Sequence, residues 1–443
     1  MKAQLLKYLD RISSSFWFLP SLMAAAAVCL AFVMVAADES VAEGAMKMPD
    51  WAYAGSAQGA SAVLQTIAGS MITIAGVVFS LTLVALSLAS SQFGPRLLRN
   101  FMRDNTNQMV LGTFVATFLY CLLVLRAIRH GVDDAFVPHL SVTLGVAFAL
   151  ASLWVLIFFI HHVSVSIQAD DIVARIVKEM DRGIGRLFPS EIGQAADPDD
   201  RASDDDPESL LRGTPAPVEA IGDGYLQIVN ADQLMEIAGR EDLQIQIMNR
   251  PGQYVVEGSC LVRVWCEHGI ASSLEDDVRS AFVLGSERTP AQDFEYSIHQ
   301  LVEVAVRALS PGVNDPFTAI RCIDRLGSGL SRLARREMPS MLRLDQDMKL
   351  RVLTPQTRFA DLVDASFDQI RQNARANAAV SIRLLEMITV IAEAATRADD
   401  LRALKKQAEM VANGAKDALP EANDRAAASE RYRACCEVLG EEV

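Results

Sequence analysis

Hydroxyl side chains recur along the uncharged apolar stretch that runs from residue 66 to residue 91. With Val77 and Val84 they form a series separated alternately by three and four residues, and its hydroxyl members are Ser70, Thr73, Ser80, Ser87 and Ser91. This spacing places the whole series on one face of a helix, which we call the hydroxyl face. Within a bilayer, such a face either packs closely against another helix or lines a water-filled pathway with uncharged oxygen atoms. The sequence leaves both interpretations open.

Ionisable residues are missing from the middle of every stretch long enough to cross a membrane. Charged groups inside a membrane are the usual marks of proton relays and of many ion-coupled transporters. Their absence therefore disfavours proton coupling along the hydroxyl face.

A basic cluster follows the hydroxyl face, and its members are Arg96, Arg99 and Arg103. Gly94 and Pro95 are expected to stop or bend the helix just before it. The favoured interpretation is that the arginines anchor the chain at the lipid headgroups. The alternative is a basic ring at the cytoplasmic mouth of a pathway, where it would attract anions or anionic lipid.

A second group of polar residues lies between residues 288 and 319. Helical periodicity predicts a helix from Phe294 to Leu309, with Thr289 as a possible cap before it and a second capped helix after the Pro311-Gly312 turn. The candidate residues of this stretch are Gln292, Asp293, His299, Glu303, Arg307, Asn314 and Asp315. The ends of a helical hairpin explain most of them, and Glu303 and Arg307 form an i,i+4 pair. The surplus of polar groups on one helix face leaves room for a buried network or a small-ligand site.

The sequence favours no enzyme class. It shows no pairing of a nucleophile with a base and no metal-ligand spacing, so we expect no catalytic residue, metal or cofactor. The seven cysteines form no CxxC pair, and those outside the apolar stretches are expected to be reduced thiols. The net charge of −14 argues against a nucleic-acid partner.

Four apolar stretches meet the length of about 20 residues that a spanning helix needs. They cover roughly residues 16–37, 63–89, 109–125 and 140–160, within a predicted transmembrane domain of residues 1–163. Lys2, Lys7 and Arg11 precede the first stretch, whereas the connection from residue 38 to residue 62 is acidic. Positive charge gathers on the cytoplasmic side of membrane proteins. The sequence therefore predicts a multi-pass inner-membrane protein with both termini in the cytoplasm.

The remainder of the chain reads as soluble, and the predicted class is mainly α. We expect a helical stalk (164–194), an acidic linker (195–217), a small β-barrel-like module (218–270) and a helical domain that continues to the end (271–443). The stretch from Pro251 to Leu261 resembles the closing hairpin of biotinyl and lipoyl domains. No lysine lies between Lys178 and Lys349, so a swinging-arm carrier function is excluded.

Three stretches carry a resemblance to a known family: GSMITIAGVVFSLTLVALSLASSQFGPRLL (69–98), RTPAQDFEYSIHQLVEVAVRALSPGVNDPFTA (288–319) and the β module between them. They resemble the bacterial predicted-membrane-protein family, domain-of-unknown-function family 2254. The resemblance covers nearly the whole chain. It implies an inner-membrane protein with four spans and a cytoplasmic C-terminal region, and it carries over no catalytic residues.

Two hypotheses follow for the function. The first is a homo-oligomeric, channel-like protein in which the second span lines a hydroxyl-rich pathway. The second is a membrane-anchored scaffold or sensor without transport, in which the hydroxyl face only packs helices together. In both, the partners are the lipid bilayer and other copies of the chain, and any small ligand or ion is unspecified.

Overall fold

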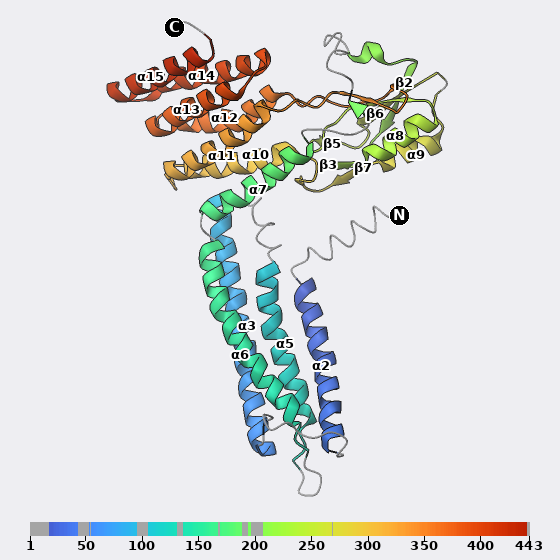
Figure 1. The fold of residues 1–443 in the computed structure, drawn as a ribbon, viewed down its shortest axis with the longest axis vertical. Coiled ribbons are helices and arrows are strands. Elements are labelled where there is room, and N and C mark those ends of the chain that lie inside the picture. Colours follow the sequence, from blue (N-terminus) through green and yellow to red (C-terminus); the bar gives the residue numbers. More distant parts are fainter. Residues whose placement is uncertain are drawn as a thin grey trace. The chain divides into compact units, whose positions relative to one another are not determined.

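The computed structural model describes residues 17–42, 53, 55–94, 105–130, 136–166, 169–187, 194–195, 207–267 and 269–440. The chain divides into two compact units, Met1–Asp171 and Ile172–Val443. The architecture is mainly helical with two sheets in the second unit (Figure 1).

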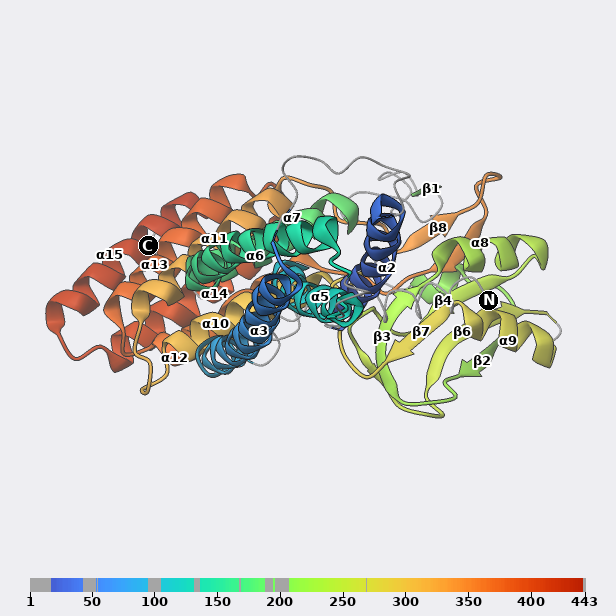
Figure 2. The ribbon, with the colours of Figure 1, turned by 90° about the horizontal axis from the view of Figure 1, so that it is seen from below.

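Among its described residues, the first unit contains four helices that are long and apolar enough to cross a membrane: α2 (Phe18–Ala42), α3 (Ala57–Phe93), α5 (Asn105–Ala127) and α6 (His139–Ser166). They correspond to the four predicted spans. Helix α5 lies in the middle and contacts α2, α3 and α6, an arrangement visible along the helices in Figure 2. Helix α3 has 37 residues. At 1.5 Å per residue it is about 56 Å long, well beyond the ~30 Å hydrocarbon core of a bilayer.

Asp38 fixes the start of α6 from within α2. Its carboxylate accepts hydrogen bonds from the backbone N–H groups of Leu140 (2.8 Å) and Ser141 (2.9 Å) and from the Ser141 hydroxyl (2.6 Å). These N–H groups have no partner within their own helix, and a carboxylate also matches the positive end of the helix dipole. Asp38 is only 4% exposed. The sequence interpretation had placed it in an acidic connection with no further role.

Helix α7 (Ala169–Leu187) lies in the predicted stalk. Its apolar residues at helical spacing are buried: Ile172, Ile176, Met180 and Ile184. Arg336 donates a hydrogen bond to the Ile184 carbonyl (3.1 Å), which ties α7 to the end of α11 (Pro316–Ala334). The stalk is therefore packed into the second unit from Ile172 onward.

The β region consists of two open sheets. One has the order β1-β8-β9-β4-β6-β2 and the other β5-β3-β7. The strands are β1 (Gln194–Ala195), β2 (Thr214–Glu219), β3 (Gly224–Val229), β4 (Gln244–Ile247), β5 (Tyr254–Val255), β6 (Cys260–Cys266), β7 (Phe282–Gly285), β8 (Leu342–Leu344) and β9 (Leu350–Leu353). Helices α8 (Ala231–Arg240) and α9 (Ser272–Ser280) pack with them. Neither sheet closes on itself, so the predicted barrel-like module is not confirmed.

The expectation of helix alone after residue 271 is wrong for three strands, β7, β8 and β9. Strand β9 pairs in parallel with β4, with Ile245 opposite Val352. Both side chains lie in the same apolar core. Strands of three or four residues are too short to show alternation, and β7 and β9 are stabilised by pairing with β3 and β4, which lie far away in the chain. The predicted linker contains the last residue of β1 and the start of β2, and its residues 196–206 lie outside the described residues.

Six helices form two layers in the C-terminal part (Figure 1). One layer contains α10 (Phe294–Ala308), α12 (Phe359–Ala374) and α14 (Ala398–Ala418), and the other contains α11, α13 (Ala378–Ala394) and α15 (Ala422–Val438). Successive helices pair as hairpins, and the hairpins stack.

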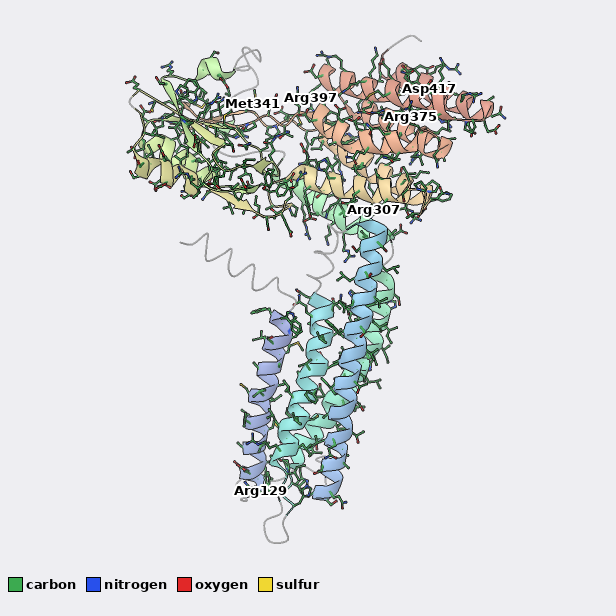
Figure 3. The ribbon with its side chains drawn as sticks, turned by 180° about the vertical axis from the view of Figure 1, so that it is seen from behind. Arg129, Arg307, Met341, Arg375, Arg397 and Asp417 are labelled. Atoms are coloured by element: carbon green, nitrogen blue, oxygen red, sulfur yellow. The ribbon has the colours of Figure 1, made fainter. Side chains whose placement is uncertain are left out.

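Helices α12 and α14 start with the same sequence motif, R-x-x-D, in which an arginine bonds to the aspartate three residues after it. Arg358 binds Asp361 (2.9 Å), and Arg397 binds Asp400 (2.8 Å). Arg397 also lies over the Phe359 ring, at 5.9 Å from its centroid, and so links the two helix starts (Figure 3).

Candidate functional site

Helix α3 has one face buried within its own bundle. The buried residues recur every three or four positions: Ala60, Leu64, Ala68, Met71, Ala75, Val78, Thr82 and Ala85. All are at most 9% exposed. This stripe packs against α5 and α6, and it accounts for the position of α3 in the first unit.

The hydroxyl face lies on the other side of α3 and is exposed. Ser70, Thr73, Ser80, Ser87 and Ser91 are all exposed side chains. The two valines of the series are exposed as well, Val77 by 52% and Val84 by 65%. The face therefore does not pack within the described part of the chain.

Several hydroxyls of this region donate hydrogen bonds to their own helix. Thr73 donates to the Gly69 carbonyl and Ser80 to the Gly76 carbonyl, each at 2.9 Å. Bonds of this kind satisfy the hydroxyl proton without water, and they leave the oxygen lone pairs directed outward. A methyl group added at Gly69 or Gly76 would meet nothing within 4 Å. The face is thus smooth, narrow and uncharged, with oxygen acceptors along it.

The predicted basic cluster of Arg96, Arg99 and Arg103 lies outside the described residues. The helix before it ends where the sequence predicted. Gly94 follows α3 with φ of 109°, and its N–H donates to the Ser90 carbonyl. A positive φ of this kind suits glycine, which has no Cβ.

Asp293 and Arg288 form the centre of the polar group in the second unit. Asp293 is the N-cap of α10 and accepts from the Tyr296 N–H (3.1 Å). Arg288 holds the same carboxylate with two bonds of 2.7 and 2.9 Å, and its third nitrogen lies 2.9 Å from Nδ1 of His299. Burial alone would lower the pKa of Arg288, but its bonds to Asp293 raise that pKa above the ordinary value. The structure thus brings Asp293 and His299 together through an arginine that the sequence interpretation did not single out.

Thr289 is not the cap of α10. The helix begins at Phe294, and Asp293 satisfies its first N–H groups. The Asp293 carboxylate also explains the neighbouring turn, because a Cβ on Gly252 would come within 2.2 Å of Oδ2. Gly252 has φ of +94°, which again suits glycine.

Gln292 completes the sheet rather than lining a site. Its side-chain oxygen accepts from the Val229 N–H (2.8 Å), and its nitrogen donates to the Val229 carbonyl (3.1 Å). The amide therefore replaces a neighbouring strand at the end of β3. No pattern in the sequence signals this role.

Arg250 and Glu295 form a second ionic contact beside this cluster. Their closest atoms are 3.6 Å apart, and Arg250 also lies 3.9 Å from Asp361. Burial raises the pKa of Glu295, and Arg250 partly opposes that effect. The contact joins the turn before β5 to α10 and α12.

The remaining predicted residues have local structural roles. Glu303 and Arg307 form the expected i,i+4 pair at 3.5 Å. Asn314 adopts φ of 48° in the turn. Asp315 caps α11 by accepting from the Thr318 N–H (3.1 Å) and hydroxyl (2.6 Å), and these bonds lower its pKa. The predicted hairpin is confirmed, and its polar residues do not converge on one point.

Other chemical features are sparse in the described ranges. No group of three or more His, Cys, Asp or Glu side chains there is placed to hold a metal ion. Burial raises the pKa of the Cys322 thiol to about 12, which makes it a poor nucleophile. A cleft of about 1400 Å³ opens beside the larger sheet, and its mixed lining includes Arg240, Asp242, Trp265 and Lys349. Its charges of both signs favour no particular ligand.

The comparisons with known proteins agree with the four apolar helices. Residues 13–390 match the family described as Predicted membrane protein (DUF2254). The chain is 31% identical over 423 residues to Uncharacterized protein Rv1290c of Mycobacterium tuberculosis (strain ATCC 25618 / H37Rv), covering 94% of this chain and 79% of that protein. The same figures hold for Uncharacterized protein Mb1321c of Mycobacterium bovis (strain ATCC BAA-935 / AF2122/97). No solved structure matches the chain.

The matched range includes the hydroxyl face, the β region and the α10–α11 hairpin, the three stretches that carried the resemblance in the sequence. The chain belongs to the DUF2254 family of predicted membrane proteins.

Proposed function

We propose that the protein is a homo-oligomeric, channel-like protein of the bacterial inner membrane, in which the hydroxyl faces of several α3 helices meet around a shared axis. The observation that carries this proposal is the exposure of the hydroxyl face from Ser70 to Ser91, while the opposite stripe of α3 is buried. An uncharged polar helix face packs more favourably against a similar face of another helix than against lipid tails. Small side chains also let a second helix approach closely.

The proposed orientation has both chain ends in the cytoplasm. Lys2, Lys7 and Arg11 precede α2, and Arg175 and Lys178 follow α6. The connection between α2 and α3 is acidic instead. Since lysine and arginine accumulate in cytoplasmic segments, this asymmetry supports the orientation.

A membrane-anchored scaffold or sensor is the second candidate. The internal hydrogen bonds of Thr73 and Ser80 favour it, because a face whose donors are already bonded can pack without water. In this case the copies would still meet along α3, but no pathway would run between them.

We also infer that the protein is not an enzyme and uses no cofactor or nucleic acid. The support is that Asp293, Asp315 and Gln292 are engaged in capping and sheet completion. A substrate bound beside Asp293, His299 or Glu303 would contradict this inference.

Conductance and thiol accessibility together distinguish the two candidates. The full-length protein is placed in planar bilayers, and Ser80→Cys is treated with a charged, membrane-impermeant thiol reagent in a background where Cys29 is replaced by Ser. Leu81→Cys is the matched control, because Leu81 is 46% exposed but lies one position off the hydroxyl face.

A channel predicts conductance, and it predicts that the reagent modifies S80C and reduces the current while L81C stays unmodified. A scaffold predicts no conductance and protection of both thiols. Conductance with equal modification of S80C and L81C would contradict a pathway along the hydroxyl face.

A further inference from the structure

The turn between α10 and α11 exposes large apolar side chains. Phe317 is 75% exposed and Val313 is 46% exposed. Pro311 and Gly312 between the two helices are exposed as well. Contiguous apolar side chains at the surface of a soluble unit mark a place of contact. Capping by Asp315 holds this turn in one conformation. The apolar side chains are therefore fixed at the surface.

Arginines continue this surface along α11. Arg321 and Arg325 are exposed and follow Phe317 at intervals of four residues, so the three side chains lie on one helix face. Arg307 stands at the other side of the turn, near the end of α10 (Figure 3). We call Val313, Phe317, Arg321 and Arg325 the α11 face.

The charge of α11 is opposite to that of the whole chain. Residues 316–336 contain five arginines and one acidic residue, Asp324, which gives this segment a net charge of +4 in a chain of −14. Such segregation needs a reason, because it places like charges close together. A negatively charged partner supplies that reason.

The chain also connects α11 to the apolar helices through a short segment. Helix α7 begins three residues after α6 ends, and α6 is one of the four apolar helices. Met180 of α7 approaches Gly329 so closely that a Cβ there would lie 2.5 Å from its terminal carbon, and Arg332 binds Asp181. The C-terminal half of α11 is therefore attached to a point fourteen residues beyond the last residue of α6.

We propose that the α11 face docks on the anionic headgroup surface of the membrane that holds the chain. Phe317 and Val313 enter the headgroup layer, and Arg321 and Arg325 bind lipid phosphates. Aromatic and aliphatic residues beside cations are the composition of interfacial membrane contacts. The patch is small, but docking within one tethered chain needs little affinity, because the effective concentration of the surface is high.

The test uses the full-length protein, one copy per lipid nanodisc. The discs contain phosphatidylcholine alone or with phosphatidylglycerol, and part of the lipid carries bromine near the headgroup, which quenches tryptophan. Phe317→Trp reports on the α11 face, read as the emission added to that of the parent protein. Tyr254→Trp is the matched control, because Tyr254 is 54% exposed but lies on β5.

Docking predicts that brominated lipid quenches the emission of F317W but not that of Y254W, and more strongly in anionic discs. Replacing Arg321 and Arg325 by Gln should lower the ratio of docked to undocked molecules by roughly 30-fold. In the unsubstituted protein, amide hydrogen exchange around Val313 and Phe317 should slow when anionic lipid is added.

Equal and weak quenching of F317W and Y254W in all discs, with exchange unchanged by lipid charge, would overturn the proposal. Protection of the turn that depends on the number of copies per disc, and not on lipid charge, would overturn it too, because the face would then bind protein.

Discussion

The Asp293 carboxylate connects the start of α10 with Arg288 and with the turn before β5. It caps α10, holds Arg288 with two hydrogen bonds and fixes the glycine turn before β5. Because the Asp293 side chain is buried and Arg288 is largely so, removing one partner leaves the other charge without compensation. The free energy lost in such a change comes from the buried charge that remains without a partner, and it exceeds what the ion pair itself contributes to stability.

We predict that Asp293→Asn destabilises the second unit by about 2–3 kcal/mol, somewhat less than for a fully buried pair. The free energy of unfolding would be measured in urea on the full-length protein, with Trp265 as the single tryptophan of residues 172–443. Glu303→Gln is the matched control, because its half-exposed i,i+4 pair contributes less than about 0.5 kcal/mol. Equal effects of the two substitutions would contradict the role of Asp293.

Replacing Gln300 is expected to stabilise the protein, in contrast to replacing Asp293. Gln300 is 1% exposed, and neither the nitrogen nor the oxygen of its amide has a hydrogen-bond partner among the residues that the structure describes. A buried amide without partners costs about 1–3 kcal/mol. Gln300→Met keeps the length of the side chain and removes the amide, so it should raise the free energy of unfolding by about 1 kcal/mol. A loss of stability in the same urea assay would show that the amide is bonded in solution.

Glu295 makes the stability depend on pH. Burial raises its pKa in the folded state, so the folded protein binds a proton more readily than the unfolded chain. The free energy of unfolding should therefore increase as the pH falls from 7 toward the ordinary carboxyl range. This contribution of Glu295 is lost as the pH rises through its folded-state pKa. Glu295→Gln should remove this dependence. Parallel pH profiles of the two proteins would contradict the assignment.

At the scale of elements, α6 depends on a cap from another helix. We predict that Asp38→Ala lowers the stability of the first unit by about 1–2 kcal/mol, because the N–H groups of Leu140 and Ser141 lose their acceptor. Glu39→Ala, which changes an exposed neighbour, should have little effect. The midpoint of thermal unfolding in detergent measures both variants, and a similar midpoint for the two would show that water caps α6 adequately.

The same scale shows what the sequence could predict. The four apolar helices were predicted from long uncharged apolar runs, and the α10–α11 hairpin from helical periodicity and the turn that follows it; all lie close to the predicted bounds. Strands β8 and β9 were missed because they have only three and four residues, and because β9 depends on pairing with the distant strand β4 while β8 pairs with β9 and β1. Asp38 and Gln292 were misinterpreted for a related reason. Their partners, Ser141 and Val229, are far away in the chain, and no local pattern announces them.

At the scale of the whole molecule, the two faces of α3 differ in their surroundings. One stripe holds the helix in its own bundle, and the hydroxyl face is exposed within the described part of the chain. The sequence correctly indicated which residues share this face. It could not indicate that the face is exposed among the described residues, because exposure depends on where α5 and α6 pack.

Disulfide formation between copies tests the central claim most directly. Ser80→Cys and Leu81→Cys, each in a background lacking Cys29, are oxidised in native membranes, and the fraction of cross-linked dimer is compared. If hydroxyl faces of neighbouring copies meet, S80C cross-links efficiently and L81C does not. Absence of cross-linking at S80C, or equal cross-linking at both positions, would contradict the claim that α3 joins copies through this face.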